Sequence, residues 1–517
     1  MHLRIEPPTQ HWPIPTARRP IWTGHQATLF HPGILAKYHA AAAAARVAGL
    51  AGASLQSVGQ HPADGGGAGG GGGVGVAQVL VDQDVYDPLR LRVPTREGDR
   101  LGVQTVSLDG GKPTGSTAAV EGVPVGMRPP VATTRIAAGL KAWPGHAAFR
   151  PDSARWLEAF DQARREADTL AQQMEGVIAR LLPGGAMSDH PGPAVYGGGV
   201  PASTLLQREQ PLLDRLLHDA ARCVRHYNAA VAQHPAAGMS RLSVQPDRVE
   251  VPLWALRWMK PRRRVYVDLA DHQPLFITED GEPLGPGVTL APRALLMTAI
   301  LRRPDRCALF IHGTGGWAYD RITEDWWRAW HADQPPTAAT EKRDPAPAHR
   351  VIGAPGPRRT AADRPADAGK LAPMAVVTAD LQLSFDQVPV NGRERLRDAV
   401  WFRHHLPHNL DRVLDLDPGD PRVRAKRELL ATMDQDRDKP RRRAAFTLLH
   451  RLNEELAQRH PDALADAERS VAAARAGLAN ARIAGRRDWS CLLYPPASLA
   501  ELWDAVTHEP TPGGARS

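Results

Sequence analysis

The sequence predicts an α/β fold built on a parallel sheet, with a long helical domain toward its carboxyl end. Residues 21–45 combine a short apolar strand, a polar turn and an alanine-rich helix, and residues 76–85 form a second apolar strand that ends in acids. Strand, turn, helix and strand in this order are the βαβ unit of a parallel sheet. A later strand at 307–312 runs into a glycine turn and a helix, and residues 393–484 are helical in pattern throughout.

Length and composition limit the classes of protein. At roughly 150 residues a domain, 517 residues suggest two to four domains. The net charge is +8, and most of the basic residues are arginines in a chain rich in Ala, Gly and Pro. Proteins that bind single-stranded nucleic acid alternate arginines with aromatic residues, and this sequence does not. We therefore expect no nucleic-acid partner. Cys223, Cys307 and Cys491 form no CxxC pair, which argues against a zinc site or a disulfide framework.

The cellular location follows from the absence of targeting patterns. The first ten residues, MHLRIEPPTQ, contain no apolar signal core, and no stretch of about eighteen apolar residues occurs in the sequence. We therefore expect a cytoplasmic protein with no membrane partner.

Composition shifts divide the chain into a core with flexible additions. Residues 52–75 carry a glycine run that predicts a flexible insertion, and the pattern GxGxxG within it is not a phosphate loop, because it precedes a strand instead of following one. The expected divisions are a core with helical connecting segments (1–332), a disordered linker (333–372), a return to the core (373–392), the helical domain (393–484), a segment docking on the core (485–508) and a disordered tail (509–517).

Apolar periodicity predicts the elements between these boundaries. Apolar spacing predicts helices at 153–182, 205–236 and 295–301. Residues 243–251 and 254–258 have strand character, and 265–269 and 274–278 are expected to form a strand pair. In the helical domain the apolar seam is thin, which is typical of an antiparallel helical hairpin or a coiled coil. Its members are Leu448, Leu449, Leu452 and Leu456.

The first candidate site lies in the turn after the first strand. Ligands of open parallel sheets bind beyond the carboxyl ends of the strands, where Gly24, His25 and Gln26 fall. Glycine lets the backbone approach a ligand, the helix N-terminus offers N–H groups to an anion, and His25 is a candidate general base. The alternative is that His25 caps the helix or bonds to a loop.

Two acids end the second strand. Asp82 and Asp84 occupy alternate positions and so face the same side, where they are suited to hold an ammonium group or a metal. The alternative is that Asp82 caps the next element and Asp84 pairs with Arg90 or Arg92.

A second glycine turn follows the strand at 307–312. The turn enters a helix expected to begin near Trp317, whose dipole favours an anion. His312 before the turn and Tyr319 after it favour a functional interpretation over purely structural glycines. Arg293 is either a carboxylate clamp or a solvated arginine at a helix end. The glycines of the turn are Gly313, Gly315 and Gly316.

Taken in order, these motifs resemble the BshC family of cysteine-adding enzymes in bacillithiol synthesis. That family has a Thr-Gly-Gln-Gln turn, a Gly-Pro helix start, an acidic strand end, an apolar-Ser-Pro…Leu-Arg segment and a glycine-rich strand exit ending in Ala-Tyr. Here residues 23–26 read Thr-Gly-His-Gln, Pro32-Gly33 inverts the Gly-Pro order, and residues 81–84, 290–293 and 313–319 stand in the later places. The family's usual first-helix lysine corresponds to His39, with Lys37 two residues away.

The resemblance implies a Rossmann-like core, a coiled-coil domain used in forming a homodimer, and an amide ligation between cysteine and a glucosaminyl-malate amine. It implies catalytic roles for His25, Gln26, Asp82 and Asp84; whether ATP activates the acid is left open. The implied substrate-binding residues are Thr23, Gly24, Arg293, Gly313, Gly315, Gly316 and Tyr319. Two other functions stay open: a nucleotide-dependent transferase of the same fold, and a non-catalytic interaction protein that acts through its helical domain.

Overall fold

The computed structural model describes most of the chain in nine stretches: residues 2–6, 19–47, 75–111, 121–188, 195–270, 273–332, 369–385, 388–435 and 437–508. Nearly all of the expected insertion at 52–75, most of the linker expected at 333–372 and the tail expected at 509–517 lie outside these residues.

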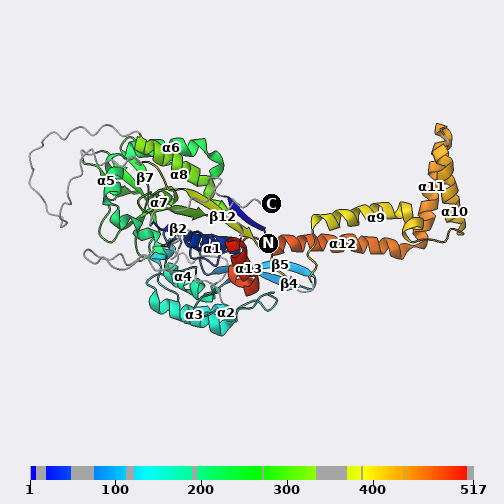
Figure 1. Ribbon diagram of the computed structural model, residues 1–517, viewed down its shortest axis with the longest axis horizontal. Coiled ribbons are helices and arrows are strands. Elements are labelled where there is room, and N and C mark those ends of the chain that lie inside the picture. Colours follow the sequence, from blue (N-terminus) through cyan, green and yellow to red (C-terminus); the bar gives the residue numbers. More distant parts are fainter. Residues whose placement is uncertain are drawn as a thin grey trace, which may run out of the picture.

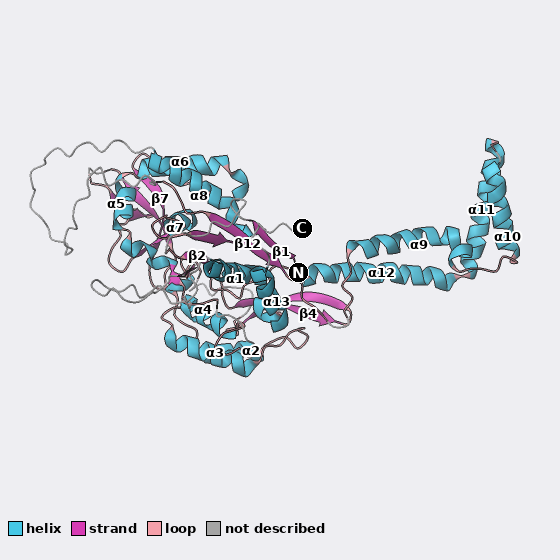
Figure 2. Ribbon diagram, in the orientation of Figure 1, coloured by secondary structure: helices cyan, strands magenta, loops and turns pink. Residues whose placement is uncertain are grey.

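A parallel sheet forms the centre of the core, so the α/β prediction is confirmed (Figures 1 and 2). Five of its strands run parallel, in the order β12-β11-β2-β3-β6, and β1 is added antiparallel to β12 at one edge. The strands are β1 (His2–Glu6), β2 (Ile21–His25), β3 (Val76–Leu80), β6 (Val200–Pro201), β11 (Leu309–His312) and β12 (Met374–Asp380).

The order of the parallel strands reverses in the middle of the sheet. From β2 the chain builds outward to β3 and β6 on one side, and then returns to place β11 and β12 on the other side of β2. The neighbours β2 and β11 are therefore the pair at which the direction of winding changes. In open parallel sheets this is the position at which a crevice forms beyond the strand ends.

Helices cover both faces of the sheet. Helix α1 (Pro32–Val47) packs on the face that presents Ile311, Ala375 and Val377, and α13 (Pro496–His508) packs on α1 in the same hydrophobic core. The opposite face presents Trp22, Val79, Phe310 and Met374 to α7 (Ala294–Leu301) and to the 3-10 helix Ala202–Arg208. Helix α8 (Thr314–Ala332) crosses back from β11 to β12.

Two smaller units flank the sheet. An antiparallel sheet, in the order β10-β7-β8-β9, packs with α6, α7 and α8 around a second buried core that holds Trp326 and Trp330. On the other side, the β4–β5 hairpin joins a group of three helices, α2 to α4. Their bounds are β4 (Arg90–Glu97), β5 (Arg100–Ser107), α2 (Thr133–Lys141), α3 (Ser153–Glu166), α4 (Leu170–Leu181), α5 (Gln210–His218), α6 (Ala220–Gln233), β7 (Arg248–Leu256), β8 (Arg263–Asp268), β9 (Leu275–Thr278) and β10 (Thr289–Pro292).

Several predicted element boundaries are wrong for local reasons. The single helix expected at 153–182 is divided because Thr169 starts a new helix: its hydroxyl accepts a bond from the Gln172 N–H, and the Gln172 side chain accepts one from the Thr169 N–H. The helix expected at 205–236 is likewise divided into a 3-10 helix, α5 and α6. Helix α8 begins at Thr314, before the predicted start near Trp317.

The residues predicted to form a helical domain make a long arm that projects from the core (Figure 1). Helices α9 and α12 run side by side along it, and α10 and α11 lie at its far end. Of the predicted apolar seam, Leu452 and Leu456 are buried but Leu448 is 49% exposed. The four helices are α9 (Arg393–Val413), α10 (Pro421–Gln435), α11 (Lys439–Arg459) and α12 (Pro461–Ala484).

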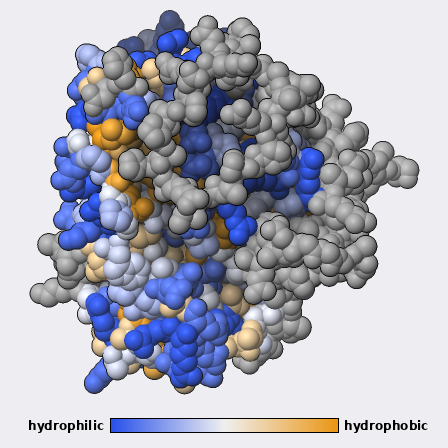
Figure 3. Space-filling view, turned by 90° about the vertical axis from the view of Figure 1, so that its left-hand side faces the viewer, coloured by the Kyte–Doolittle hydropathy of each residue, from blue (hydrophilic) through white to orange (hydrophobic). Residues whose placement is uncertain are grey.

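The surface seen from the end opposite the arm is mostly hydrophilic where it is described, with hydrophobic residues in separate small areas (Figure 3). None of the helices within the described residues has the length and apolar character needed to cross a membrane. All three cysteines are buried and carry free thiols.

Candidate functional site

The ends of β2 and β11 lie next to each other, which brings the two predicted glycine turns together. The Thr23 hydroxyl donates to the carbonyl of Ile311 at 3.0 Å and so ties the two strands just below their carboxyl ends. Gly24 follows in a place too narrow for a side chain, because a Cβ there would lie 2.2 Å from Val79 Cγ1. Thr23 and Gly24 therefore shape the site through packing and hydrogen bonding.

The side chain of Lys37, in α1, reaches the turn that follows β2. Its ammonium group donates to the Gly24 carbonyl at 2.8 Å, and the residue is 2% exposed. Burial lowers the pKa of Lys37 to about 7. Its aliphatic carbons border Gly313, since a Cβ on that glycine would lie 3.5 Å from Lys37 Cδ. A buried lysine with a lowered pKa is a group that can act as a base, a nucleophile or a donor near neutral pH.

His25 stands beside Lys37 at the end of β2. Its Nδ1 lies 3.1 Å from the carbonyl oxygen of Gln26, and its ring meets Phe30 edge-on. Burial, with added repulsion from Lys37 and His312, lowers the pKa of His25 to about 3. His25 is therefore neutral at physiological pH, and because its Nδ1–H faces the Gln26 carbonyl, its Nε2 is suited to accept a hydrogen bond.

A histidine–aspartate pair forms the other half of the site. His312 ends β11, and its Nδ1 lies 2.6 Å from Oδ2 of Asp320 in α8. The Asp320 carboxylate is fully buried, whereas the His312 side chain keeps 18% of its surface exposed. A carboxylate in this position fixes the imidazole and directs its other nitrogen, Nε2, outward as a base.

The glycines of the second turn have different roles. A Cβ on Gly316 would lie 1.5 Å from the His312 ring, so the histidine can occupy its position only because residue 316 is glycine. At Gly315 no atom lies within 4 Å of the position that a Cβ would take. Gly313 has room for a Cβ in ordinary contact with Lys37. The turn thus requires glycine for packing at one position of the three.

The edge of the site is formed by Gln26, Asp84 and Tyr319. The Gln26 amide donates to Asp84 Oδ2 at 3.2 Å, and Arg262 forms an ion pair with Asp84 Oδ1 at 2.8 Å. Burial and the nearby carboxylates of Asp320 and Asp84 raise the pKa of Tyr319 to about 12, so its phenol stays protonated. The sequence-based alternative that pairs Asp84 with Arg90 or Arg92 is wrong: its cation is Arg262.

Asp82 is buried and is hydrogen-bonded within the protein. It is 3% exposed and accepts bonds from the N–H and hydroxyl of Ser203, the second residue of the 3-10 helix Ala202–Arg208. Burial raises the pKa of Asp82 to about 6 despite these bonds. Asp82 therefore holds the start of a helix more than a hundred residues later, and not the next element along the chain as the sequence-based alternative had it.

Arg293 is engaged by the protein. Its guanidinium forms an ion pair with the buried Glu250 at 2.8 Å and lies over the Trp254 ring, 4.1 Å from the centroid. Arg262 stacks on the same tryptophan at 4.2 Å. Arg293 is thus not a solvated arginine, and part of its guanidinium is already bound to Glu250, so that part is not free to bind a carboxylate ligand. Arg293 also orients the Trp254 ring, on which Arg262 stacks.

Sequence reasoning missed Lys37 and Asp320. Lys37 is a charged residue inside an apolar, alanine-rich helix, and this was the available signal. Asp320 lies eight residues after His312, a spacing that places it two turns into the following helix. His39, which stands where the family's lysine is usual, instead packs against Trp503 of α13.

The arrangement combines a neutral imidazole, a carboxylate-oriented imidazole and a lysine of low pKa at the point where the strand order reverses. Such a set can remove a proton from an amine and stabilise a developing negative charge. Within the stretches that the structure describes, no group of three or more histidine, cysteine, aspartate or glutamate side chains is placed to hold a metal ion.

A scan against protein-family models and a search of curated proteins found no match to this chain. The function is therefore argued from the site and from the motifs of the sequence.

Proposed function

We propose that the protein is a carbon–nitrogen ligase of the BshC type, which joins cysteine to a glucosaminyl-malate amine on a Rossmann-like core. Numbered along the chain, the parallel strands take the order 3-2-1-4-5, which supports the Rossmann-like assignment. The observation that carries the proposal is the meeting of Lys37 and His25 with the His312–Asp320 pair at the point of reversal.

In this proposal His312 is the general base. Nε2 takes a proton from the attacking amine while Asp320 stabilises the imidazolium that forms. The amine nitrogen bonds to the carboxyl carbon of cysteine, and the bond from that carbon to its leaving group breaks. Lys37 donates a hydrogen bond to the oxyanion, while the neutral His25, whose Nδ1–H faces the Gln26 carbonyl, accepts a hydrogen bond from the substrate at Nε2.

A free carboxylate is not reactive enough to form an amide, so it must first be activated. ATP is the candidate activator, and the leaving group is then a phosphate or AMP. Gln26, Tyr319 and the Asp84–Arg262 pair form the edge at which the polar amine substrate is held. The proposal includes small-molecule substrates and a cytoplasmic location. It includes no nucleic-acid partner and no membrane partner.

The decisive experiment mixes the purified full-length protein with cysteine, glucosaminyl malate and ATP and detects the coupled thiol by mass spectrometry. We expect product from the wild type, loss of product with His312→Asn, and retention with His146→Asn, whose side chain is exposed and outside the site. No product under any nucleotide condition would refute the proposal.

A nucleotide-dependent transferase on the same scaffold is the second candidate, and the environment of Asp82 favours it. With Asp82 bonded to Ser203, only Asp84 of the two acids reaches the site, which changes how an amine is held. A thermal-shift panel of nucleotides and sugar acids separates the two functions: stabilisation by nucleotides together with an acid other than glucosaminyl malate would favour the transferase.

We include in the proposal a homodimer formed through the helical arm as a coiled coil. The arm exposes large apolar side chains on α9, of which Trp401 is 62% exposed, and on α11, where Phe446 is 54% exposed. Sedimentation velocity tests this directly. Trp401→Glu is expected to yield monomers, whereas Trp258→Glu, at a 50% exposed tryptophan on the core, is expected to leave the dimer intact.

A further inference from the structure

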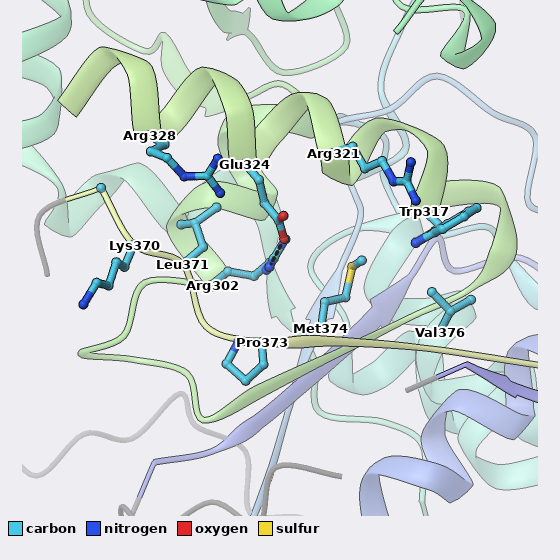
Figure 4. Close-up of a pocket in the computed structure, with 11 residues that line it drawn as sticks. Arg302, Trp317, Arg321, Glu324, Arg328, Lys370, Leu371, Pro373, Met374 and Val376 are labelled. Carbon is cyan, nitrogen blue, oxygen red and sulfur yellow. Dashed lines mark hydrogen bonds and ion pairs between the residues drawn. The ribbon is translucent and has the colours of Figure 1, made fainter. Parts of the chain in front are cut away.

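A pocket of about 460 Å³ lies outside the site described above, between α8 and the segment leading into β12 (Figure 4). Trp317, Arg321, Glu324 and Arg328 line it from the helix. Their spacing of four, three and four residues places them on one side of α8, while Trp326 and Trp330 face the buried core on the other side. The helix therefore presents a charged stripe to this pocket.

The floor and the opposite wall come from the strand side. Met374 and Val376 of β12 supply apolar side chains, and both are largely buried. Arg302 lies at the base, 2% exposed, where its Nε and Nη2 donate to the Ala372 carbonyl at 3.0 and 2.8 Å. These bonds fix the chain just before β12, so the base of the pocket is rigid.

The charges in the pocket do not cancel. Arg302 is paired with Glu324, the carboxylate that lines the pocket, at 2.5 Å (Figure 4). That pair leaves two further cations, Arg321 and Arg328, on the wall of the pocket that α8 forms. Arg328 is 3.5 Å from Asp325, an exposed and weak contact. Among the described residues Arg321 has no carboxylate in ion-pair range, and its guanidinium lies 4.8 Å from the Trp317 ring centroid.

A second observation points to a missing partner. Nη1 of the buried Arg302 has no hydrogen-bond acceptor within the described structure. A buried guanidinium nitrogen without an acceptor is costly. Because Arg302 is one of the residues that line the pocket, an anion bound there adds negative charge near this cation. Arginine is also the side chain whose planar fork matches the oxygens of a phosphate.

The length of the stripe constrains the ligand. Arg321 and Arg328 are seven residues apart, or about 10 Å along a helix axis at 1.5 Å per residue. A molecule with more than one phosphate, or with a phosphate and an apolar part lying on Met374 and Trp317, fits an elongated site of this kind.

The geometry points to a binding site for a small phosphate-bearing anion in this pocket, with Arg321 and Arg328 as its main ligands and Trp317 as a lateral contact. This inference does not depend on the proposed ligase activity, since none of these residues belongs to the His25–His312 site.

Isothermal titration of the full-length protein with inorganic pyrophosphate tests the inference. We expect saturable binding, which Arg321→Gln weakens about tenfold and Arg321→Gln/Arg328→Gln abolishes, through loss of charge-assisted hydrogen bonds. Arg424→Gln, an exposed arginine on α10 in the arm, removes the same charge elsewhere and is expected to leave binding unchanged. Malonate, a dicarboxylate, is expected to bind more weakly than pyrophosphate.

Three outcomes would overturn the inference: no saturable heat with pyrophosphate, equal affinities for the wild type and Arg321→Gln, or equal weakening by Arg424→Gln. Equal affinity for malonate would show a general anion site and reject the phosphate assignment. Because Arg321 and Arg328 are exposed, both variants should fold, and thermal melts that match the wild type verify this.

Discussion

Nδ1 of His312 lies 2.6 Å from Oδ2 of Asp320, although one residue ends a strand and the other lies in the second turn of the next helix. The contact depends on Gly316 between them, which leaves room for the imidazole ring. The turn from β11 to α8 therefore positions a histidine base and its carboxylate in a single local unit. Its neighbour across the sheet is the Gly24–Lys37 hydrogen bond.

The first prediction concerns this pair. Asp320→Asn keeps the shape of the side chain but removes the negative charge that orients His312 and stabilises its protonated form. We expect the rate of amide formation to fall roughly 10²–10⁴-fold, the usual contribution of a general base. The measurement is kcat as a function of pH.

Helix α8 contains a matched control for this substitution. Asp325 contacts Nε2 of His234 at 2.8 Å, so it forms a second aspartate–histidine pair on the same helix but away from the site. Asp325→Asn is expected to leave kcat within about twofold of the wild type, since the effects of distant sites are usually independent. Equal losses in both variants would mean that the His312–Asp320 pair is structural.

The second prediction separates the two neighbouring glycines of the turn. Gly316→Ala forces the His312 ring to move, because the new Cβ would lie 1.5 Å from it. Gly315→Ala meets no atom within 4 Å and replaces glycine by a better helix former in the first turn of α8. We expect Gly316→Ala to lose activity and stability, and Gly315→Ala to keep activity with an unchanged or higher melting temperature. Loss of activity in both variants would assign the turn a role in ligand binding.

The parallel sheet could be predicted from the sequence because the residues that indicate it lie close together along the chain. The short apolar runs of β2 and β3, each continuously buried over most of its length, and the polar turn after β2 suffice to identify a βαβ unit. The meeting of the turns after β2 and β11 followed from the general rule for open sheets. The order of the strands in the sheet depends on the connections between them. The long segments after β3 and β6 contain no sequence pattern that predicts which strand the chain next pairs with.

The fates of the two aspartates could not be predicted because they depend on distant partners. Asp82 is held by Ser203 and Asp84 by Arg262, both more than a hundred residues away. Strand alternation does not extend to these acids, because β3 ends at Leu80, and it does not reveal which hydrogen-bond donors the fold brings to each. Lys37 was missed for a related reason: its carbonyl partner at Gly24 becomes visible only when α1 is packed on the sheet.

The third prediction is a pH-dependent effect of Lys37 on stability. Its pKa falls from 10.5 to about 7 on folding because burial disfavours the charged form. Between these values the unfolded chain binds a proton that the folded chain lacks, so the free energy of unfolding rises with pH across this window. Lys37→Met removes this dependence. We expect the variant to gain most, by a few kcal/mol, below pH 7 and to lose that advantage above about pH 10.

Urea unfolding at several pH values measures this effect, with Lys426→Met as the comparison. Lys426 is also buried, at 3% exposed, but it has a carboxylate partner, Asp411, at 2.5 Å. Removing it leaves the buried Asp411 unpaired, for which we expect a loss of about 3–5 kcal/mol. Opposite signs for the two lysines are the expected result. A loss of stability with Lys37→Met at pH 6 would contradict the low pKa.

The fourth prediction concerns His39, a buried polar residue between α1 and α13. Both of its ring nitrogens lack a hydrogen-bond partner among the described residues, and its ring centroid lies 5.0 Å from that of Trp503. Burial lowers the pKa of His39 to about 3. An unsatisfied buried polar group costs about 1–3 kcal/mol, so His39→Phe, which keeps a ring beside Trp503, is expected to stabilise the protein at pH 7.

The same substitution should reduce acid sensitivity. Between pH 6.5 and about 3 the unfolded chain protonates His39 while the folded chain does not, so this residue lowers the free energy of unfolding as the pH falls through that range. The gain from His39→Phe therefore grows from pH 7 toward pH 4 in urea unfolding. His31→Phe is the matched control, because Nδ1 of His31 accepts the Gly33 N–H at 3.0 Å and its loss leaves that donor unpaired. We expect His31→Phe to destabilise at pH 7, and a destabilising effect of His39→Phe at that pH would show that its nitrogens are satisfied in solution.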